Sequence, residues 1–253
     1  MNEQRKCAFT IVDDRYYYAV GTPIFINSFL KFHPDDDIDL IIFRQDMVDK
    51  VFAKEGINFY QAKPYFGEIA ANLGYKVVCN IDADTVITGR LTEVFDNVDY
   101  DVAGAWNFND YENASFENIT AEMYIQAGMV ASTSRLFWKK WKEINKTAMR
   151  YIRKENDTLN LLAYNDKEIS KLKLKILDKD KDYYGCKSLG REGEMYIKND
   201  QLMLRNEVVR AYHHARGGVF PKLDFDNMPF TEEVKRWLNF ISNYGVSVVY
   251  GKM

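Results

Sequence analysis

The chain has few cysteines and no excess of basic residues. Cys7, Cys79 and Cys186 are the only cysteines in 253 residues, and an odd number at wide spacing, with no CxxC pair, indicates neither a disulfide framework nor a zinc knuckle. Basic residues number 34 against 37 acidic ones, for a formal net charge of −3. This balance leaves no basic footprint for nucleic acid or anionic lipid. We therefore expect a protein of the reducing cytoplasm with no nucleic-acid partner.

Long apolar runs and linker-like segments are also missing. No run approaches the ~20 apolar residues of a membrane helix, and residues 1–14 lack a signal-peptide core. We expect a soluble chain without an integral membrane segment; peripheral membrane association is the alternative. No Pro-, Gly- or Ser-rich linker interrupts the sequence, which is 47% hydrophobic. These features predict one domain over 1–253, with halves at about 1–105 and 106–222 and a C-terminal helix and tail at about 223–253.

What is present is an alternation of strand-like and helix-like segments. Residues 6–14, 20–32 and 37–43 read as a βαβ opening, and residues 67–74 and 75–87 as a helix and a strongly apolar strand. A strand at 100–106 and a mostly helical stretch at 132–165 follow. The alternating "KLKLKIL" at 171–177 predicts an edge strand with its lysines toward water. Residues 231–241 predict a helix that begins after Thr231 and packs on the core. The fold class is α/β, with a mostly parallel sheet flanked by helices.

The segment "CNIDADTVITG" at 79–89 raises the question of function. It carries Asp82 and Asp84 to the end of an apolar strand, where a parallel sheet forms its ligand crevice. Two ionised carboxylates so close together are costly without a cation. A divalent ion such as Mn²⁺ or Mg²⁺ would offset that cost and could bridge the phosphates of a nucleotide. A solvated strand end without chemistry is the plain alternative.

The same residues fit a second pattern. Asp82, Asp84 and Val86 match the Asp-x-Asp-x-(Thr/Val) motif of haloacid-dehalogenase phosphatases, in which the first aspartate is the nucleophile. However, a βαβ unit precedes the motif here, and no Gly-Asp acidic cluster follows it. The phosphatase therefore remains the rival hypothesis.

Five segments, in order, resemble the retaining GT-A glycosyltransferases of family 8, the group with glycogenin and bacterial lipooligosaccharide galactosyltransferases. They are "TIVDDRYYYAVGTPIFINSFLKFHPDDDIDLIIF", "NIDADTVITGRLTEVFD", "YIQAGMVASTSRLFWKKW", "ENDTLNLL" and "HHARGGVFPK". The resemblance spans residues 7 to about 222. It implies a GT-A fold, which is a Rossmann-like nucleotide-sugar transferase fold.

The resemblance also implies site residues. A nucleotide-binding set would comprise Thr10, Val12, Asp13, Arg15, Tyr16, Asp82, Ala83, Gly217 and Lys222. Asp82, Asp84 and His214 would hold the metal, because His214 rather than His213 sets the following glycine and proline in the family's register. Phe220 stands where the family has its phosphate-binding lysine, so Lys222 or Arg216 would substitute.

Residues near the donor sugar follow from two of the segments. Gln126 stands where the family has an asparagine amide that reaches the sugar, and Glu155, Asn156 and Asp157 would lie beside the anomeric carbon. Asn107 would contact a sugar hydroxyl. From the residues alone, Glu155 and Asp157 are also typical first-turn acids of a helix.

The resemblance therefore implies a glycosyltransferase that moves a sugar, with retention, from a UDP-sugar donor to a glycan or another hydroxyl acceptor. The loops at 109–123 and 180–196 are the expected acceptor-selecting segments. The alternatives are the phosphatase and a protein that binds a nucleotide sugar or glycan without turning it over.

Overall fold

The computed structural model describes residues 5–12, 21–34, 38–57, 61–106, 118–148, 155–177, 182–187, 192–213 and 225–243. The chain divides into two compact units. The first unit is Met1–Val12, Asp37–Asp82 and Leu91–Asp180, and the second is Asp13–Asp36, Ala83–Arg90 and Lys181–Met253. No helix of the described residues is long and apolar enough to cross a bilayer.

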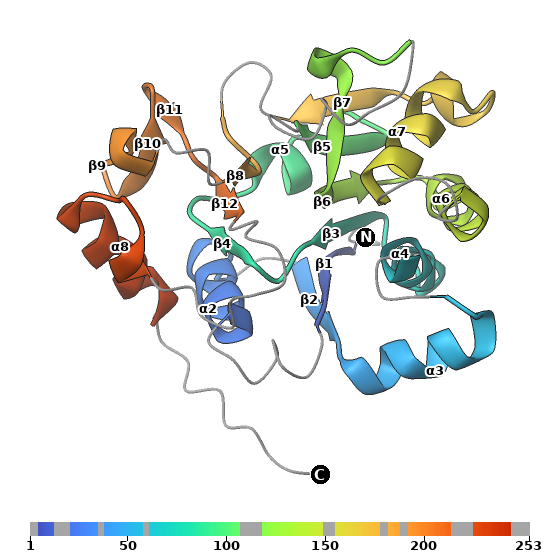
Figure 1. Cartoon of the computed structure of the whole chain (residues 1–253), viewed down its shortest axis with the longest axis horizontal. Helices are drawn as coiled ribbons and strands as arrows, with labels where there is room; N and C mark the ends of the chain where they lie inside the picture. The colour runs from blue at the N-terminus through green and yellow to red at the C-terminus, as the bar shows by residue number, and fades with distance from the viewer. Residues whose placement is uncertain are drawn as a thin grey trace. The chain divides into compact units, whose positions relative to one another are not determined.

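A six-stranded sheet organises the first unit (Figure 1). Its order is β2 (Ile38–Phe43), β1 (Lys6–Ile11), β3 (Val77–Ile81), β6 (Ile125–Ser132), β5 (Val102–Trp106) and β7 (Leu174–Leu177). The pairs β1–β2, β1–β3 and β5–β7 are parallel, and only the two pairs made by β6 are antiparallel. This confirms the predicted mixed, mostly parallel sheet. The carboxyl ends of β1, β3 and β5 therefore meet the amino end of β6 at one edge of the sheet.

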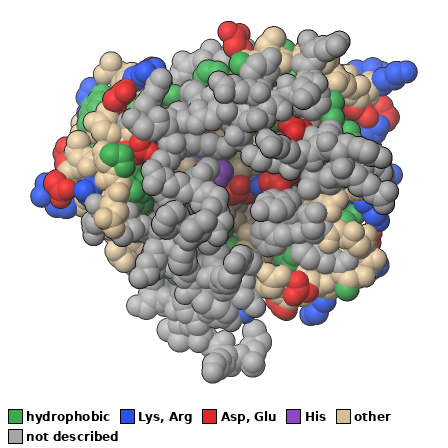
Figure 2. Space-filling model, viewed as in Figure 1, with side chains coloured by type: hydrophobic (Ala, Val, Ile, Leu, Met, Phe, Trp, Pro, Cys, Tyr) green, Lys and Arg blue, Asp and Glu red, His purple; other side chains and the backbone are tan. Residues whose placement is uncertain are grey.

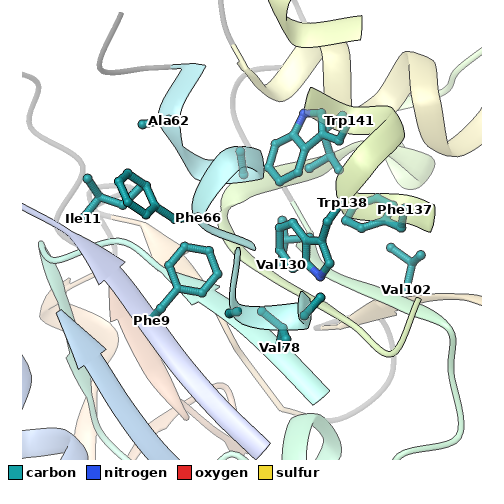
Figure 3. Close-up of a cluster of buried hydrophobic side chains, with 14 of the residues drawn as sticks. Phe9, Ile11, Ala62, Phe66, Val78, Val102, Val130, Phe137, Trp138 and Trp141 are labelled. Atoms are coloured by element: carbon teal, nitrogen blue, oxygen red, sulfur yellow. The ribbon is translucent and has the colours of Figure 1, made fainter. Parts of the chain in front are cut away.

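Three helices pack on this sheet through aromatic side chains. They are α4 (Ala62–Asn72), α6 (Arg135–Ala148) and α7 (Glu155–Asn165). Phe66 of α4 and Trp138 of α6 point toward Phe9 of β1 in Figure 3, and the rings of Phe9 and Trp138 lie 5.9 Å apart edge to face. Gly67 lets α4 approach Trp138, because a Cβ there would lie 2.2 Å from the indole ring. This core fixes α4 and α7, which carry site residues, against the strands.

The rest of the first unit comprises α3 (Gln45–Glu55), α5 (Thr92–Phe95), and the short 3₁₀ turns η3 (Ala121–Met123) and η4 (Ile169–Lys171). The helix α3 is an addition to the predicted elements. Its only fully buried described side chain is Val48, so it lacks the apolar stripe by which a helix is recognised.

The second unit is built on α2 (Gly21–Phe32) and α8 (Glu232–Ser242), which pack together and share one core with β4 (Thr85–Ile87). Its strands form two three-stranded sheets, β11–β10–β9 and β4–β12–β8. Their bounds are β8 (Cys186–Lys187), β9 (Tyr196–Lys198), β10 (Gln201–Leu204), β11 (Glu207–Val208) and β12 (Ala211–His213), and the 3₁₀ turns are η5 (Glu192–Glu194) and η6 (Phe225–Asn227). The backbone N–H of Val234 donates to Thr231 Oγ1, as predicted for the start of α8.

Several local predictions are confirmed and one is refined. Gly74, with φ of +90°, follows the end of α4, and β7 is an edge strand. On β7, Lys175 lies 3.0 Å from Glu93 and 2.9 Å from Asp99, so it faces carboxylates rather than water alone. The helical stretch at 132–165 contains two helices, and Ser134 Oγ accepts from Phe137 N at the start of α6.

Candidate functional site

Asp82 stands at the carboxyl end of β3, the strand between β1 and β6. All five residues of β3 are buried, and its pairing with β6 ends at Ile81 and Met129. The N–H of Asp82 still donates to Gly128 O at 2.8 Å, while its carboxylate is 24% exposed. The apolar strand therefore fixes the backbone of Asp82 and leaves its side chain partly exposed at the carboxyl end of β3.

Asp84 is the second residue of the turn between β3 and β4, and it lies beside a histidine of the same, second unit. In the antiparallel pair β4–β12, His213 lies opposite Thr85, and its Nε2 is 3.0 Å from Asp84 Oδ1. One ligand atom each from Asp82, Asp84 and His213 lie within 4.8 Å of one another. Two carboxylate oxygens and an imidazole nitrogen form a donor set that suits Mn²⁺ or Mg²⁺.

The histidine in this cluster is the neighbour of the predicted one. His214 lies outside the described residues, so its metal role stays a prediction, while His213 is the described imidazole at Asp84. The glycine and proline spacing favoured His214, but the pairing of β12 with β4, which places His213 beside Asp84, is not visible in the sequence. The predicted residues Asp13, Arg15, Tyr16, Asn107, Arg216, Gly217 and Lys222 also lie outside the described part of the chain.

Lys63, on the first turn of α4, joins Asp82 to Glu155. Its Nζ lies 2.8 Å from Asp82 Oδ1, 3.1 Å from Asp82 Oδ2 and 2.7 Å from Glu155 Oε1, and it donates to Ala127 O at 3.3 Å. The lysine side chain is 11% exposed. Lys63 is absent from the residues predicted for the site, because its partners are 19 and 92 positions away in the chain.

Burial and neighbouring charges shift the pKa values of Lys63 and Glu155. Burial would lower the pKa of Lys63, but the facing carboxylates Asp82 and Glu155 raise it well above the usual lysine value. Burial also raises the pKa of Glu155, an effect that Lys63 opposes and Asp82 reinforces. Oε2 of Glu155 is buried and has no hydrogen-bond partner among the described residues. One oxygen of Glu155 therefore has hydrogen-bonding capacity that the described residues do not use.

The next residues of α7 are held by the strand β6. Asn156 Oδ1 accepts from the N–H of Ala127 at 2.7 Å, and Asp157 Oδ1 accepts from the hydroxyl of Tyr124. The side chain of Asn160 makes two bonds to the backbone of Ile125, accepting from N at 2.9 Å and donating to O at 2.7 Å. The structure thus brings the start of α7 and the amino end of β6 together.

β6 is irregular where it approaches these groups. Its register with β5 passes from the pair Gly104–Val130 to the pair Ala105–Gln126, so three residues of β6 bulge from the ladder. In the bulge, Ala127 O accepts from Asn80 Nδ2 at 2.9 Å as well as from Lys63. Bulges of this kind re-aim side chains next to functional sites. Gln126 itself is 1% exposed and donates to Trp106 O at 3.3 Å.

The described members of the predicted nucleotide-binding set lie at strand ends. Val12 N donates to Phe43 O at 3.0 Å, just past β1. Thr10 is fully buried in β1, and its hydroxyl has no partner within the described ranges. Ala83, at 7% exposure, is the small residue of the turn between the two aspartates.

On the face drawn in Figure 2, acidic and basic side chains of the described residues are intermixed around the rim. No single-sign basic patch is visible on that part of the surface.

Comparison with solved structures finds glycosyltransferases. The galactosyltransferase LgtC with donor and acceptor sugar analogues is similar with a TM-score of 0.52 at 14% identity, over 83% of this chain and 87% of that one. An active-site mutant of LgtC is similar with a TM-score of 0.58 at 14% identity, over 92% of this chain and 94% of that one. A glycosyltransferase involved in glycosylation of the major capsid of PBCV-1 is similar with a TM-score of 0.52 at 10% identity, over 85% of this chain and 95% of that one.

No protein-family model and no curated protein sequence matches the chain. The structural likeness, at these identities, is a likeness of fold. It covers most of both chains and agrees with the family-8 resemblance of the five sequence segments. This protein has the GT-A fold that those glycosyltransferases share.

Proposed function

We propose that this protein is a metal-dependent, retaining glycosyltransferase that uses a nucleotide-sugar donor, a UDP-sugar, and a glycan or other hydroxyl acceptor. The observation that carries the proposal is the group of Asp82, Asp84 and His213 at the carboxyl end of β3. The fold adds support, because solved structures that share it are glycosyltransferases, one of them with donor and acceptor sugar analogues. Ligands of such sheets bind at this edge.

The donor set fits the metal that the proposal requires. Asp82 and Asp84 offer hard oxygens and His213 a nitrogen, a combination that Mn²⁺ accepts readily and Mg²⁺ less so. When bound, the ion would act as a Lewis acid toward the diphosphate leaving group. The formal net charge of −3 is compatible with an anionic donor on these terms, since the site supplies its own cation.

Each predicted residue has a task in this proposal. Thr10, Val12 and Ala83, with Asp13, Arg15 and Tyr16, would bind the nucleoside, and Gly217 and Lys222 the diphosphate. Gln126 and the start of α7 would face the donor sugar. Among Glu155, Asn156 and Asp157, we favour Glu155 for this contact: Oε1 pairs with Lys63, but the buried Oε2 has no hydrogen-bond partner in the described residues.

Retention requires the acceptor hydroxyl to end on the face that the leaving group vacates. A carboxylate near the anomeric carbon stabilises the oxocarbenium-like centre or attacks it. We assign that position to Glu155, and Lys63 holds its other oxygen in place at 2.7 Å. The loops at 109–123 and 180–196 would select the acceptor, and the cytoplasm remains the predicted compartment.

An Asp84→Asn variant tests the metal role. We expect the wild type to gain thermal stability from UDP with Mn²⁺ but not from UDP with a chelator, since a ligand of the native state stabilises it. Asp84→Asn should lose that gain while it keeps its fold by circular dichroism. Asp46→Asn is the matched control, because Asp46 is an exposed carboxylate on α3. An unchanged gain in Asp84→Asn would refute the metal role.

A further inference from the structure

The ammonium group of Lys63 is placed where it must affect any cation bound at Asp82. It lies within 3.1 Å of both carboxylate oxygens of Asp82, so neither oxygen is free of its charge. Glu155 and the carbonyl of Ala127 complete its surroundings. At 11% exposure, little water screens it.

We propose that Lys63 is a built-in competitor of the divalent metal, so that the ion binds tightly only together with the nucleotide diphosphate. This inference rests on the proposed function, because it takes Asp82 as a metal ligand. According to this proposal, Lys63 weakens metal binding to the free protein. Binding of the diphosphate then raises the affinity of the protein for the metal.

The physical basis is repulsion between the ammonium and the ion. A lysine is charged at neutral pH, and a divalent ion on Asp82 would lie within a few ångströms of Nζ, where Coulomb energies in a partly buried site are large. The Asp82 carboxylate has enough lone pairs to bind both the ammonium group and the ion. Lys63 therefore weakens metal binding without preventing it.

The ammonium group of Lys63 keeps hydrogen-bond acceptors when a metal is bound at Asp82. Glu155 Oε1, at 2.7 Å, and Ala127 O, at 3.3 Å, remain as partners of Nζ when Asp82 is shared with an ion. The two negative charges of a diphosphate then offset the excess of positive charge. Metal and nucleotide should therefore bind with positive coupling, and the coupling is reciprocal.

The experiment is a Mn²⁺ titration of the full chain, with free Mn²⁺ followed by electron paramagnetic resonance, with and without UDP. The variant is Lys63→Gln, which removes the charge but keeps a hydrogen-bond donor. Lys63→Arg keeps the charge and serves as its counterpart. Lys142→Gln is the matched control, because Lys142 of α6 makes a part-buried ion pair with Glu68 of α4, the helix that also carries Lys63.

Without UDP, we expect Lys63→Gln to bind Mn²⁺ at least about tenfold more tightly than the wild type, a modest fraction of the Coulomb energy at such distances. UDP should then raise its affinity less than it raises that of the wild type. Lys63→Arg and Lys142→Gln should bind as the wild type does. Equal or weaker UDP-free binding by Lys63→Gln would overturn the inference, as would tighter binding by Lys63→Arg.

The failure of the inference differs from failure of the proposed function. Mn²⁺ binding that UDP strengthens equally in the wild type and in Lys63→Gln would keep the metal site and overturn the role of Lys63. No Mn²⁺ binding by either protein, with or without UDP, would overturn both.

Discussion

Replacement of Asn160 by alanine should loosen the start of α7 from β6. The Asn160 side chain is fully buried and makes three hydrogen bonds: from Ile125 N at 2.9 Å, to Ile125 O at 2.7 Å and to Asn156 O at 2.8 Å. A typical bond contributes about 1 kcal/mol, and a buried group left without a partner costs about 1–3 kcal/mol. Ile125 is fully buried too. We therefore expect Asn160→Ala to lower the free energy of unfolding by about 3–5 kcal/mol.

Urea denaturation measures this loss, and hydrogen exchange at the Ile125 amide locates it. The amide should exchange faster in Asn160→Ala, because Asn160 Oδ1 is its acceptor. Asn165→Ala is the control on the same helix: Asn165 accepts one exposed bond, from Asn118, and should cost less than about 0.5 kcal/mol. A loss below 1 kcal/mol in Asn160→Ala, with normal protection of Ile125, would refute the role given to this side chain.

Two further changes test the packing and the charge of the first unit. Gly67→Ala should destabilise by about 2 kcal/mol in urea, because overpacking a core costs about 1–3 kcal/mol and the new Cβ would lie 2.2 Å from Trp138; a more stable variant, as helix propensity alone predicts, would contradict the packing. Lys63→Gln should lose about 2–4 kcal/mol at pH 7, since a buried ion pair loses one partner. The raised pKa of Lys63 in the folded state means that its contribution is complete below the unfolded lysine pKa of about 10.4 and is lost as pH rises through the folded value. The difference between wild type and variant should thus stay constant from pH 7 to 9 and shrink above about pH 10.4; a difference that shrinks already between pH 7 and 9 would count against the pairing.

The sequence allowed five of the six strands of the main sheet and the place of Asp82 to be predicted, because these depend on local pattern; β6 was not predicted, and the single strand predicted at 75–87 is divided into β3 and β4. The strands of the βαβ opening and β3 are short apolar runs bounded by polar residues, and their length favours a buried parallel strand over a helix. The position of Asp82 at the carboxyl end of β3 follows from the length of that run.

Features that depend on contacts between distant segments were not predicted. Lys63 belongs to the site only because α4 packs where β3 ends and α7 begins, and nothing near Lys63 in the sequence marks that role. The bulge of β6 and the placement of His213 beside Asp84 likewise arise from strand register. Asn160 lies in the segment "ENDTLNLL", but its role in holding Ile125 becomes visible only in the structure.

The most direct test of the central claim is release of UDP from UDP-sugars, measured with a panel of UDP-hexoses and UDP-pentoses in the presence of Mn²⁺ or a chelator. Water can replace the acceptor in such an assay, so the acceptor need not be known. A glycosyltransferase with its metal at Asp82 and Asp84 should release UDP from at least one donor with Mn²⁺ and from none with chelator. Release from no donor, together with inorganic phosphate from a phosphomonoester, would contradict the claim and identify the Asp82–Asp84 segment as a phosphatase motif.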